Sequence, residues 1–186
     1  LTGQINVEFK KPQTADIVSA NLFASSAERY EANADASVHL SPRWTTMLLA
    51  HYENETKSHD SNDDGFADIP RVEQYNFWNR WAYMGDNYVF QAGIKAMTEE
   101  RRSGQVSHGG GNMIDPYTIS IKTDRYEFFA KNAYIFDKEK NTNLALIVSG
   151  TLHNQDAAYG RKLYDVDQKN VYASLLFETE FSHIHS

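Results

Sequence analysis

The chain has 186 residues, which by length alone indicates one domain. Its formal net charge of −7 argues against nucleic acid as a partner, because phosphate backbones are bound by basic patches. The mean hydropathy is −0.60, and the longest aliphatic runs, 47–50 and 144–148, are too short for a membrane-spanning helix. A helical membrane protein is therefore excluded, whereas a membrane β-barrel is not, because alternating residues hide its apolar face from any average.

The first residues predict a short strand over 4–10, which Pro12 ends because proline cannot donate to a sheet ladder. No charged and apolar leader of the signal-peptide type opens the sequence, so we expect the chain to be a piece of a longer protein. Residues 16–25 then alternate between apolar and polar, with Phe23 as the exception. Residues 29–40 alternate most clearly, with Tyr30, Ala32, Ala34, Ala36, Val38 and Leu40 on one face and Arg29, Glu31, Asn33, Asp35, Ser37 and His39 on the other.

The pattern continues over 44–55 and through a long hairpin over 72–97. A tight turn at 41–43 precedes the first of these strands, and the turn at 85–87 joins the two strands of the hairpin. The apolar face of the hairpin consists of Tyr75, Phe77, Trp81, Tyr83, Tyr88, Phe90, Ala92, Ile94 and Ala96, and Asn79 interrupts it. An apolar, aromatic face opposite a charged face is typical of a membrane barrel, with lipid outside and a polar lumen inside.

After the hairpin, a polar connection over 102–117 leads to a predicted strand over 119–136. A short turn over 137–143 then precedes strands at 144–153 and 167–179, which a loop around 156–163 separates. The sequence thus predicts about eight antiparallel strands of roughly ten residues, long enough for tilted strands to cross a bilayer. Short turns alternate with longer loops, as in outer-membrane barrels.

These features predict an all-β protein, an antiparallel up-and-down transmembrane β-barrel. Four aromatic residues close to the short turns are expected to form a girdle at one membrane surface: Trp44, Tyr83, Tyr88 and Tyr134. Polar residues of the alternating strands are expected to face the lumen, chiefly Glu31, Asp35, His51, Arg80 and Lys95.

Five segments of the chain carry a family resemblance. The first is the opening Gly3-Gln4-Ile5-Asn6-Val7, and the others are ERYEANADASVHLSPRWTTMLLAHY, DSNDDGFADIP, NRWAYMGDNYVFQAGIKAMTEERRSGQ and LYDVDQKNVYASLLFETEF. The first resembles the last plug strand of TonB-dependent outer-membrane receptors, which leads into the barrel. The others resemble successive barrel hairpins of receptors of this type from the Bacteroidetes.

The resemblance implies that residues 1–12 are the end of the plug domain and that 13–186 are the N-terminal part of a 22-stranded, plugged barrel. It implies a Gram-negative outer-membrane protein that is not an enzyme. Such a receptor imports a scarce ligand, a siderophore, cobalamin or haem-type metal chelate, by energised movement of the plug. The implied partners are outer-membrane lipid, a TonB-type energiser acting through the missing N-terminal region, the metal chelate and a surface lipoprotein.

An acidic stretch over 60–68 is similar to the first half of a calcium loop. Oxygen-bearing side chains at alternate positions followed by glycine suit Ca²⁺, and the expected ligands are Asp60, Asn62, Asp64, the Phe66 carbonyl and Asp68. Arg71 stands where an EF-hand has its last glutamate, so an EF-hand proper is not expected. A solvated loop that uses Asp and Asn as turn formers is the other interpretation.

Histidines supply the remaining candidates. His108 and Asn112, in a glycine-rich stretch, are candidate contacts for the ligand, and His108 also for haem iron. His183 and His185 have a spacing that places both on one face of a strand, although they lie at the chain end.

Two other function classes remain open from the sequence. A small closed eight-stranded barrel with an adhesive or structural role fits the strand count, but not the additional strand predicted over 4–10. An outer-membrane hydrolase would need an acid/base pair at the rim, for which His153 with Asp156 is the nearest candidate.

Overall fold

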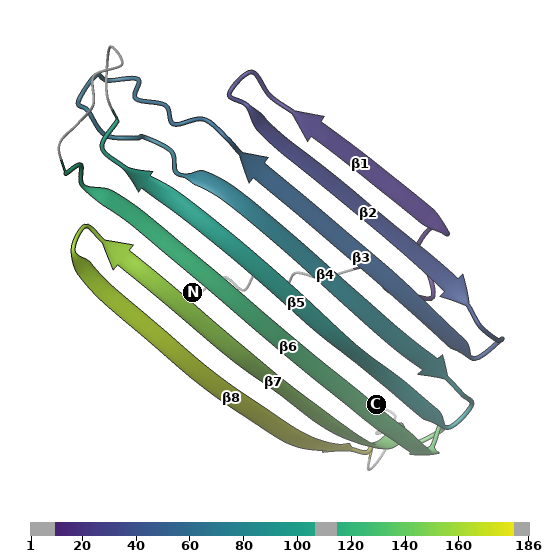
Figure 1. Ribbon diagram of the computed structural model, residues 1–186. Coiled ribbons are helices and arrows are strands. Elements are labelled where there is room, and N and C mark those ends of the chain that lie inside the picture. The colour runs from purple at the N-terminus through teal and green to yellow at the C-terminus, as the bar shows by residue number, and fades with distance from the viewer. Residues whose placement is uncertain (1–9, 107–114, 181–186) are drawn as a thin grey trace, which may run out of the picture.

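The computed structural model describes residues 10–106 and 115–180 (Figure 1). Within these ranges the chain is all-β and contains no helix, so none that is long and apolar enough to cross a membrane. Its eight strands are β1 (Val18–Ala24), β2 (Arg29–His39), β3 (Trp44–Glu55), β4 (Arg71–Met84), β5 (Tyr88–Gly104), β6 (Thr118–Asp137), β7 (Thr142–Tyr159) and β8 (Lys162–Glu178). Each pairs antiparallel with the next in the chain. The predicted all-β, antiparallel, up-and-down fold is confirmed.

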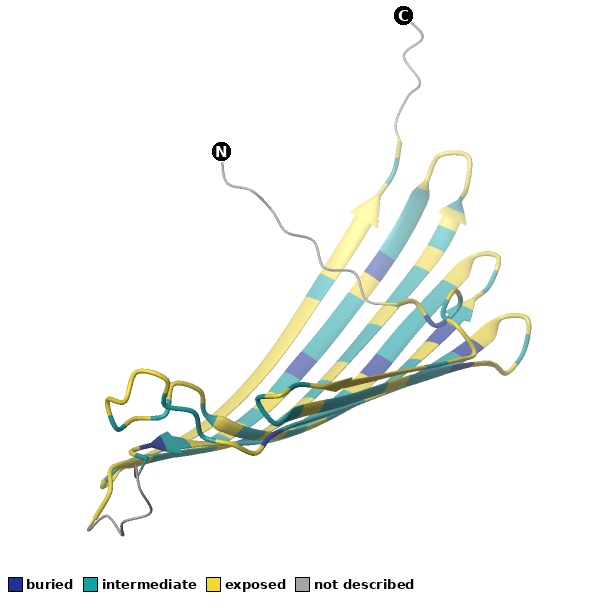
Figure 2. Ribbon diagram, turned by 90° about the horizontal axis from the view of Figure 1, so that it is seen from above, coloured by how far each residue is buried: buried dark blue, intermediate teal, exposed yellow. Residues whose placement is uncertain are grey.

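The sheet is open. β1 and β8 form its edges, and within the part of the chain that the structure describes each of them pairs with a single neighbour. Figure 2 shows the sheet bent, with the segment that leads into β1 on the inner side of the bend. Such a curved, open, up-and-down sheet has the form of a section of a barrel wall.

Tight turns connect the strands at one end of the sheet, over 40–43, 85–87 and 138–141. The Arg43 guanidinium donates a hydrogen bond to the Asp86 carboxylate at 2.9 Å, which joins the first two turns. A hydrogen bond with Tyr83, together with the charge of Asp86, raises the pKa of Arg43 above its ordinary value. Trp44 and Tyr83 are cross-strand partners beside these turns, with ring centroids 5.1 Å apart.

Connections at the other end differ from the prediction in one place. Long connections over 56–70 and 105–117 occur as expected. The loop predicted around 156–163 is wrong, because β7 and β8 pair as far as Tyr159 and Lys162 and leave only Gly160 and Arg161 in the turn. Gly160 has φ +60°, the conformation that a two-residue hairpin turn needs at its first central position. Residues 153–156 are polar on both faces, which hid the continuation of β7 from a pattern based on hydrophobicity.

The described residues form almost no hydrophobic core. The buried hydrophobic residues of the described chain are Met47, Ala82, Ala145 and Ala157. From β2 to β7, nearly all of the large apolar side chains that are exposed stand on one face of the single layer, which we call the apolar face; examples are Ile94 at 61% and Tyr126 at 52% exposure. In β8, exposed apolar side chains lie on both faces. Asn79 lies on this face, and its amide donates to Thr46 Oγ1 and to the Met47 carbonyl, so the interruption in the apolar row is hydrogen-bonded.

Candidate functional site on the polar face of the sheet

Polar side chains from several strands meet on the inner side of the bend, which we call the polar face. Strand register decides which residues meet. Asn33 pairs with His51, His51 with Asn76, and Asn76 with Met97, so one row crosses β2 to β5. The next row towards the long loops contains Glu31, Glu53, Gln74 and Glu99. Because side chains alternate between faces, all of these residues project to the same side.

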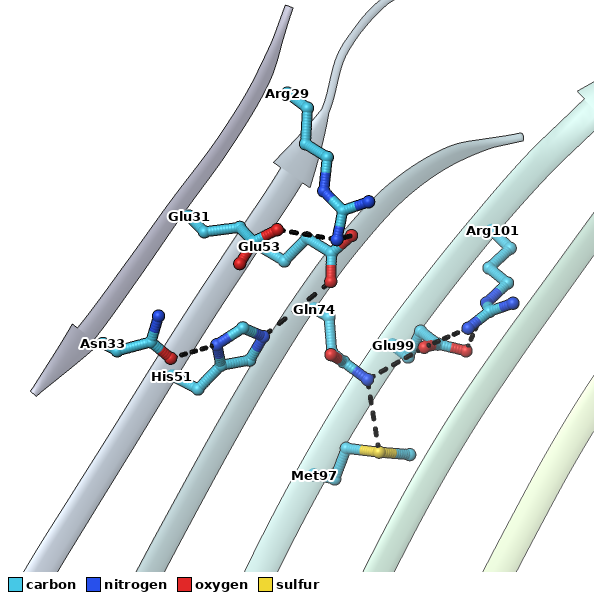
Figure 3. Close-up of polar contacts among 9 residues, drawn as sticks. All are labelled: Arg29, Glu31, Asn33, His51, Glu53, Gln74, Met97, Glu99 and Arg101. Atoms are coloured by element: carbon cyan, nitrogen blue, oxygen red, sulfur yellow. Dashed lines mark hydrogen bonds and ion pairs between the residues drawn. The ribbon is translucent and has the colours of Figure 1, made fainter. Parts of the chain in front are cut away.

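Arg29 links two carboxylates of the second row. Its guanidinium Nη2 lies 2.6 Å from Glu31 Oε1 and 3.1 Å from Glu53 Oε1 (Figure 3). Glu31 and Glu53 are directly opposite each other on β2 and β3, where like charges repel. The shared arginine compensates for this repulsion and holds the two carboxylates together.

His51 lies between an amide and a carboxylate. Its Nδ1 is 2.7 Å from Asn33 Oδ1, and its Nε2 is 3.8 Å from Glu53 Oε2. Both ring nitrogens therefore face oxygen atoms, as Figure 3 shows. The arrangement fixes the orientation of the imidazole ring on the polar face.

A second group lies across β4 and β5. The Gln74 amide donates to Glu99 Oε2 at 2.9 Å, and Arg101 donates to both oxygens of Glu99, at 2.7 and 2.9 Å (Figure 3). This bidentate pair is the stronger form of the arginine–carboxylate interaction. Towards the short turns, Lys95 lies 3.5 Å from Glu127, to which Arg125 also donates.

The five residues predicted to face a lumen all lie on the polar face. Glu31 and His51 belong to the network of Arg29, whereas Asp35 and Lys95 are paired with Lys10 and Glu127 respectively. Arg80 stacks its guanidinium over the Trp78 ring, 4.8 Å from the centroid. Sequence reasoning placed Arg29 and Gln74 on the polar face and considered Glu99 and Arg101 for the lumen rim or for ion pairs across strands. It did not predict which of them meet, and it missed Glu53, because only the cross-strand register brings these residues together.

Unpaired polar atoms are concentrated on the same face. Five buried side-chain atoms have no hydrogen-bond partner among the described residues: Arg29 Nε, Asp35 Oδ2, Asn76 Oδ1, Arg80 Nε and His153 Nδ1. By register, every one of them projects from the polar face. Buried polar groups in folded proteins nearly always have partners. The unpaired atoms of the polar face are thus available for hydrogen bonds to a further polar surface or to water.

The acidic stretch over 60–68 forms a turn that is held by its own side chains. Asp60 accepts hydrogen bonds from the backbone N–H groups of Asp64 and Gly65, at 3.2 and 2.7 Å. Asp64 accepts from the Phe66 N–H at 2.8 Å, and Asp68 from the Ser61 N–H at 2.7 Å. Of these bonds, the one from the Phe66 N–H to Asp64 spans two residues, as in an Asx turn, and the others close the wider loop.

Calcium binding by this turn stays a prediction. Asn62 Oδ1 also accepts from the Asp64 N–H, at 3.2 Å, so the predicted side-chain ligands are all engaged with the loop itself. Across residues 10–106 and 115–180, no three His, Asp or Glu side chains are arranged so that they could hold a metal ion.

At the end of the sheet opposite the tight turns, hydrogen bonds join neighbouring connections into a rim. His59 contacts the Ala27 carbonyl at 3.0 Å, which links the 56–70 connection to the turn between β1 and β2. The Ala67 N–H donates to the Gly104 carbonyl at 2.9 Å, and the Gly160 N–H donates to the Thr118 carbonyl at 2.7 Å. The rim therefore extends from β1 to β8.

Of the other predicted site residues, the structure describes only His153 and Asp156. His108, Asn112, His183 and His185 lie outside the described residues. His153 projects from the polar face, whereas Asp156, three positions further along β7, projects from the opposite face. These two side chains cannot act as a pair on one substrate.

A comparison of the chain with protein-family models, curated proteins and solved structures finds no match.

Proposed function

We propose that this chain is part of the wall of a transmembrane β-barrel in a Gram-negative outer membrane, in a receptor of the TonB-dependent type. The observation that carries the proposal is the single-layer sheet in which β2 to β7 expose nearly all of their large apolar residues on one face, with almost no core among the described residues. In water such a face would be strongly unfavourable, at about 25 cal/mol for each Å² of apolar surface. Lipid as the neighbouring medium removes that cost.

Aromatic spacing supports a membrane band of defined height. Trp44 and Tyr52 on β3, Tyr75 and Tyr83 on β4, and Tyr126 and Tyr134 on β6 are each separated by eight residues. Eight residues span about 27 Å along a strand, or roughly 20 Å in height at a tilt of about 40°. This is close to the apolar band of outer-membrane barrels, which aromatic girdles flank on both sides.

Across the sheet these residues form two lines, one of Trp44, Tyr83 and Tyr134 and the other of Tyr52, Tyr75 and Tyr126. Both lines shift in the same direction from β3 to β6. Tyr52 lies in one cross-strand row with Tyr75, but Tyr126 lies one row closer to the short turns. Trp44 and Tyr134 differ by one row in the same direction. Two parallel lines that run obliquely to the rows are expected where tilted strands cross two parallel membrane surfaces.

The polar face supports an interior that is covered by protein and water. Its ion pairs, its five unpaired polar atoms and the docking of Lys10 against Asp35 all suit a lumen that contains a plug. Import of a siderophore, cobalamin or haem-type metal chelate, driven by a TonB-type energiser, is the activity that the sequence resemblance implies for such a barrel. The loop rim would meet the ligand first, together with a surface lipoprotein.

The proposal is tested by labelling adjacent residues on opposite faces. The chain contains no cysteine, so Phe77→Cys and Trp78→Cys introduce single thiols on the apolar and polar faces of β4. In native outer-membrane fractions, Cys in place of Phe77 should react with a lipid-soluble maleimide and resist a charged one. Cys in place of Trp78 should show the opposite preference, because it lies in the lumen.

Equal reactivity of both thiols towards the charged reagent would contradict the membrane proposal.

The size of the native polypeptide separates the two barrel types. A heat-modifiable band far above 21.2 kDa is expected for a plugged receptor. A band near 21.2 kDa would instead favour a small closed barrel with an adhesive or structural role.

A further inference from the structure

A short segment before β1 is bound to the polar face. Residues 10–17 form a turn in which the N–H groups of Thr14 and Ala15 donate to the Lys11 carbonyl, at 3.1 and 3.0 Å. Ser37 of β2 then holds the segment at two points. Its N–H donates to the Ile17 carbonyl at 2.9 Å, and its hydroxyl donates to the Pro12 carbonyl at 2.6 Å.

Charged groups hold the start of the segment from two different strands. The Lys10 ammonium lies 3.0 Å from Asp35 Oδ1 on β2. The Lys10 carbonyl accepts a hydrogen bond from Arg80 on β4, which is itself stacked on Trp78. Because β3 lies between β2 and β4, the segment bridges three strands.

Met47 lies in the row of the sheet that the segment crosses. It lies between Ser37 and Arg80 in one cross-strand row of the polar face. Both of these neighbours bind the segment, and Met47 is fully buried, the largest such side chain in the described chain. The position of Met47 between these two contacts agrees with the segment crossing the sheet above it.

We propose that residues 10–17 are a fixed anchor that stays with the barrel wall when the plug moves. The boundary between the fixed and the moving part then lies before Lys10, and not after residue 12 as the sequence resemblance implies. The existence of a moving plug rests on the proposed function, whereas the anchor itself rests on the contacts of Lys10, Pro12 and Ile17.

The test uses the ion pair between Lys10 and Asp35. A water-soluble carbodiimide joins a paired amine and carboxylate as an amide, and mass spectrometry of the full native polypeptide quantifies the joined peptides. We expect the same yield, within about twofold, in energised cells and in cells treated with a protonophore. A yield that falls about fivefold or more on energisation would overturn the fixed anchor, since that factor corresponds to loss of one net hydrogen bond.

Variants show whether the anchor is built as described. Arg80→Ala should lower the yield about fivefold, and Ser37→Ala, which keeps the ion pair intact, should lower it by a similar factor. Arg125→Ala is the matched control, because Arg125 is an arginine of the polar face that pairs with Glu127 and does not contact the segment. An unchanged yield in both anchor variants, each shown to fold by its heat-modifiable band, would contradict the assignment.

Failure of the two proposals can be distinguished. If the polypeptide is absent from the outer-membrane fraction, the proposed function fails, while the yields of the purified, folded variants still test the anchor. If the thiol-labelling pattern is as expected but the Lys10–Asp35 product does not form, only the anchor fails.

Discussion

The two faces of the sheet consist of alternate residues of the same strands, yet different interactions organise them. Ile94 on the apolar face is 61% exposed, while its neighbour Lys95 on the polar face pairs with Glu127 at 3.5 Å. On the apolar face, what is regular is the kind of side chain at each height along the strand. On the polar face, each side chain has particular bonding partners. The apolar face is therefore adapted to a medium and the polar face to specific neighbours.

The largest expected effect comes from placing a charge on the apolar face. Ile94→Arg, near the middle of the proposed band, should destabilise the folded barrel by about 2–4 kcal/mol, the cost of arginine at the bilayer midplane. Thr151→Arg is the control, because Thr151 lies on the polar face directly opposite Glu127. Denaturant titration of the heat-modifiable form in lipid measures both variants. Equal costs at the two positions would show that the faces do not differ in their surroundings.

A smaller effect is expected from breaking the network on the polar face. Glu53→Gln removes the charge that Arg29 and His51 share, and hydrogen bonds to charged groups contribute about 1.5–3 kcal/mol when fully buried. The Arg29 side chain is 43% exposed, so solvent screening reduces the expected loss to about 1 kcal/mol. The same titration measures it.

Glu139→Gln supplies the comparison for the polar network, because it makes the same chemical change in the exposed turn over 138–141. Its expected effect lies below about 0.5 kcal/mol. A loss in Glu53→Gln that does not exceed the loss in Glu139→Gln would mean that the network does not stabilise the barrel.

The contrast between the faces also explains what the sequence could predict. Period-two alternation was sufficient to identify eight strands and their two faces, because burial or lipid contact imposes it on every residue in turn. The short turns between them then indicated that consecutive strands pair. The spacing of Trp44 and Tyr134 from the short turns was visible for the same reason. The fold was therefore predictable from local pattern alone.

The network around Glu53 was not predictable in this way. Glu31, Glu53 and Glu99 lie on three strands, and their meeting depends on a register that no local pattern specifies. The hairpin at Gly160 was missed because residues 153–156 of its first strand are polar on both faces. The acidic turn was found by its motif, but the bonding of Asp60 to the loop backbone could not be read from spacing.

The smallest expected effect compares one substitution on both faces. Gly150→Ala adds a methyl group on the apolar face against the ring of Phe128, which is 46% exposed and is free to move outward. Gly93→Ala adds the same group on the polar face against the ring of Phe129, with Trp78 Nε1 at 3.0 Å. The rings of Trp78 and Phe129 pack edge to face with their centroids 6.5 Å apart, so neither ring can move without disturbing the other.

Both substitutions restrict the unfolded chain equally, so the difference between them isolates the packing of the two faces. We expect Gly150→Ala to be nearly neutral and Gly93→Ala to cost about 0.5–1 kcal/mol, the lower end of the range for overpacking. Denaturation midpoints of the two variants, measured in the same lipid, provide the comparison. A larger loss in Gly150→Ala would indicate that the apolar face is packed against a defined protein surface, because lipid would give way to the displaced ring.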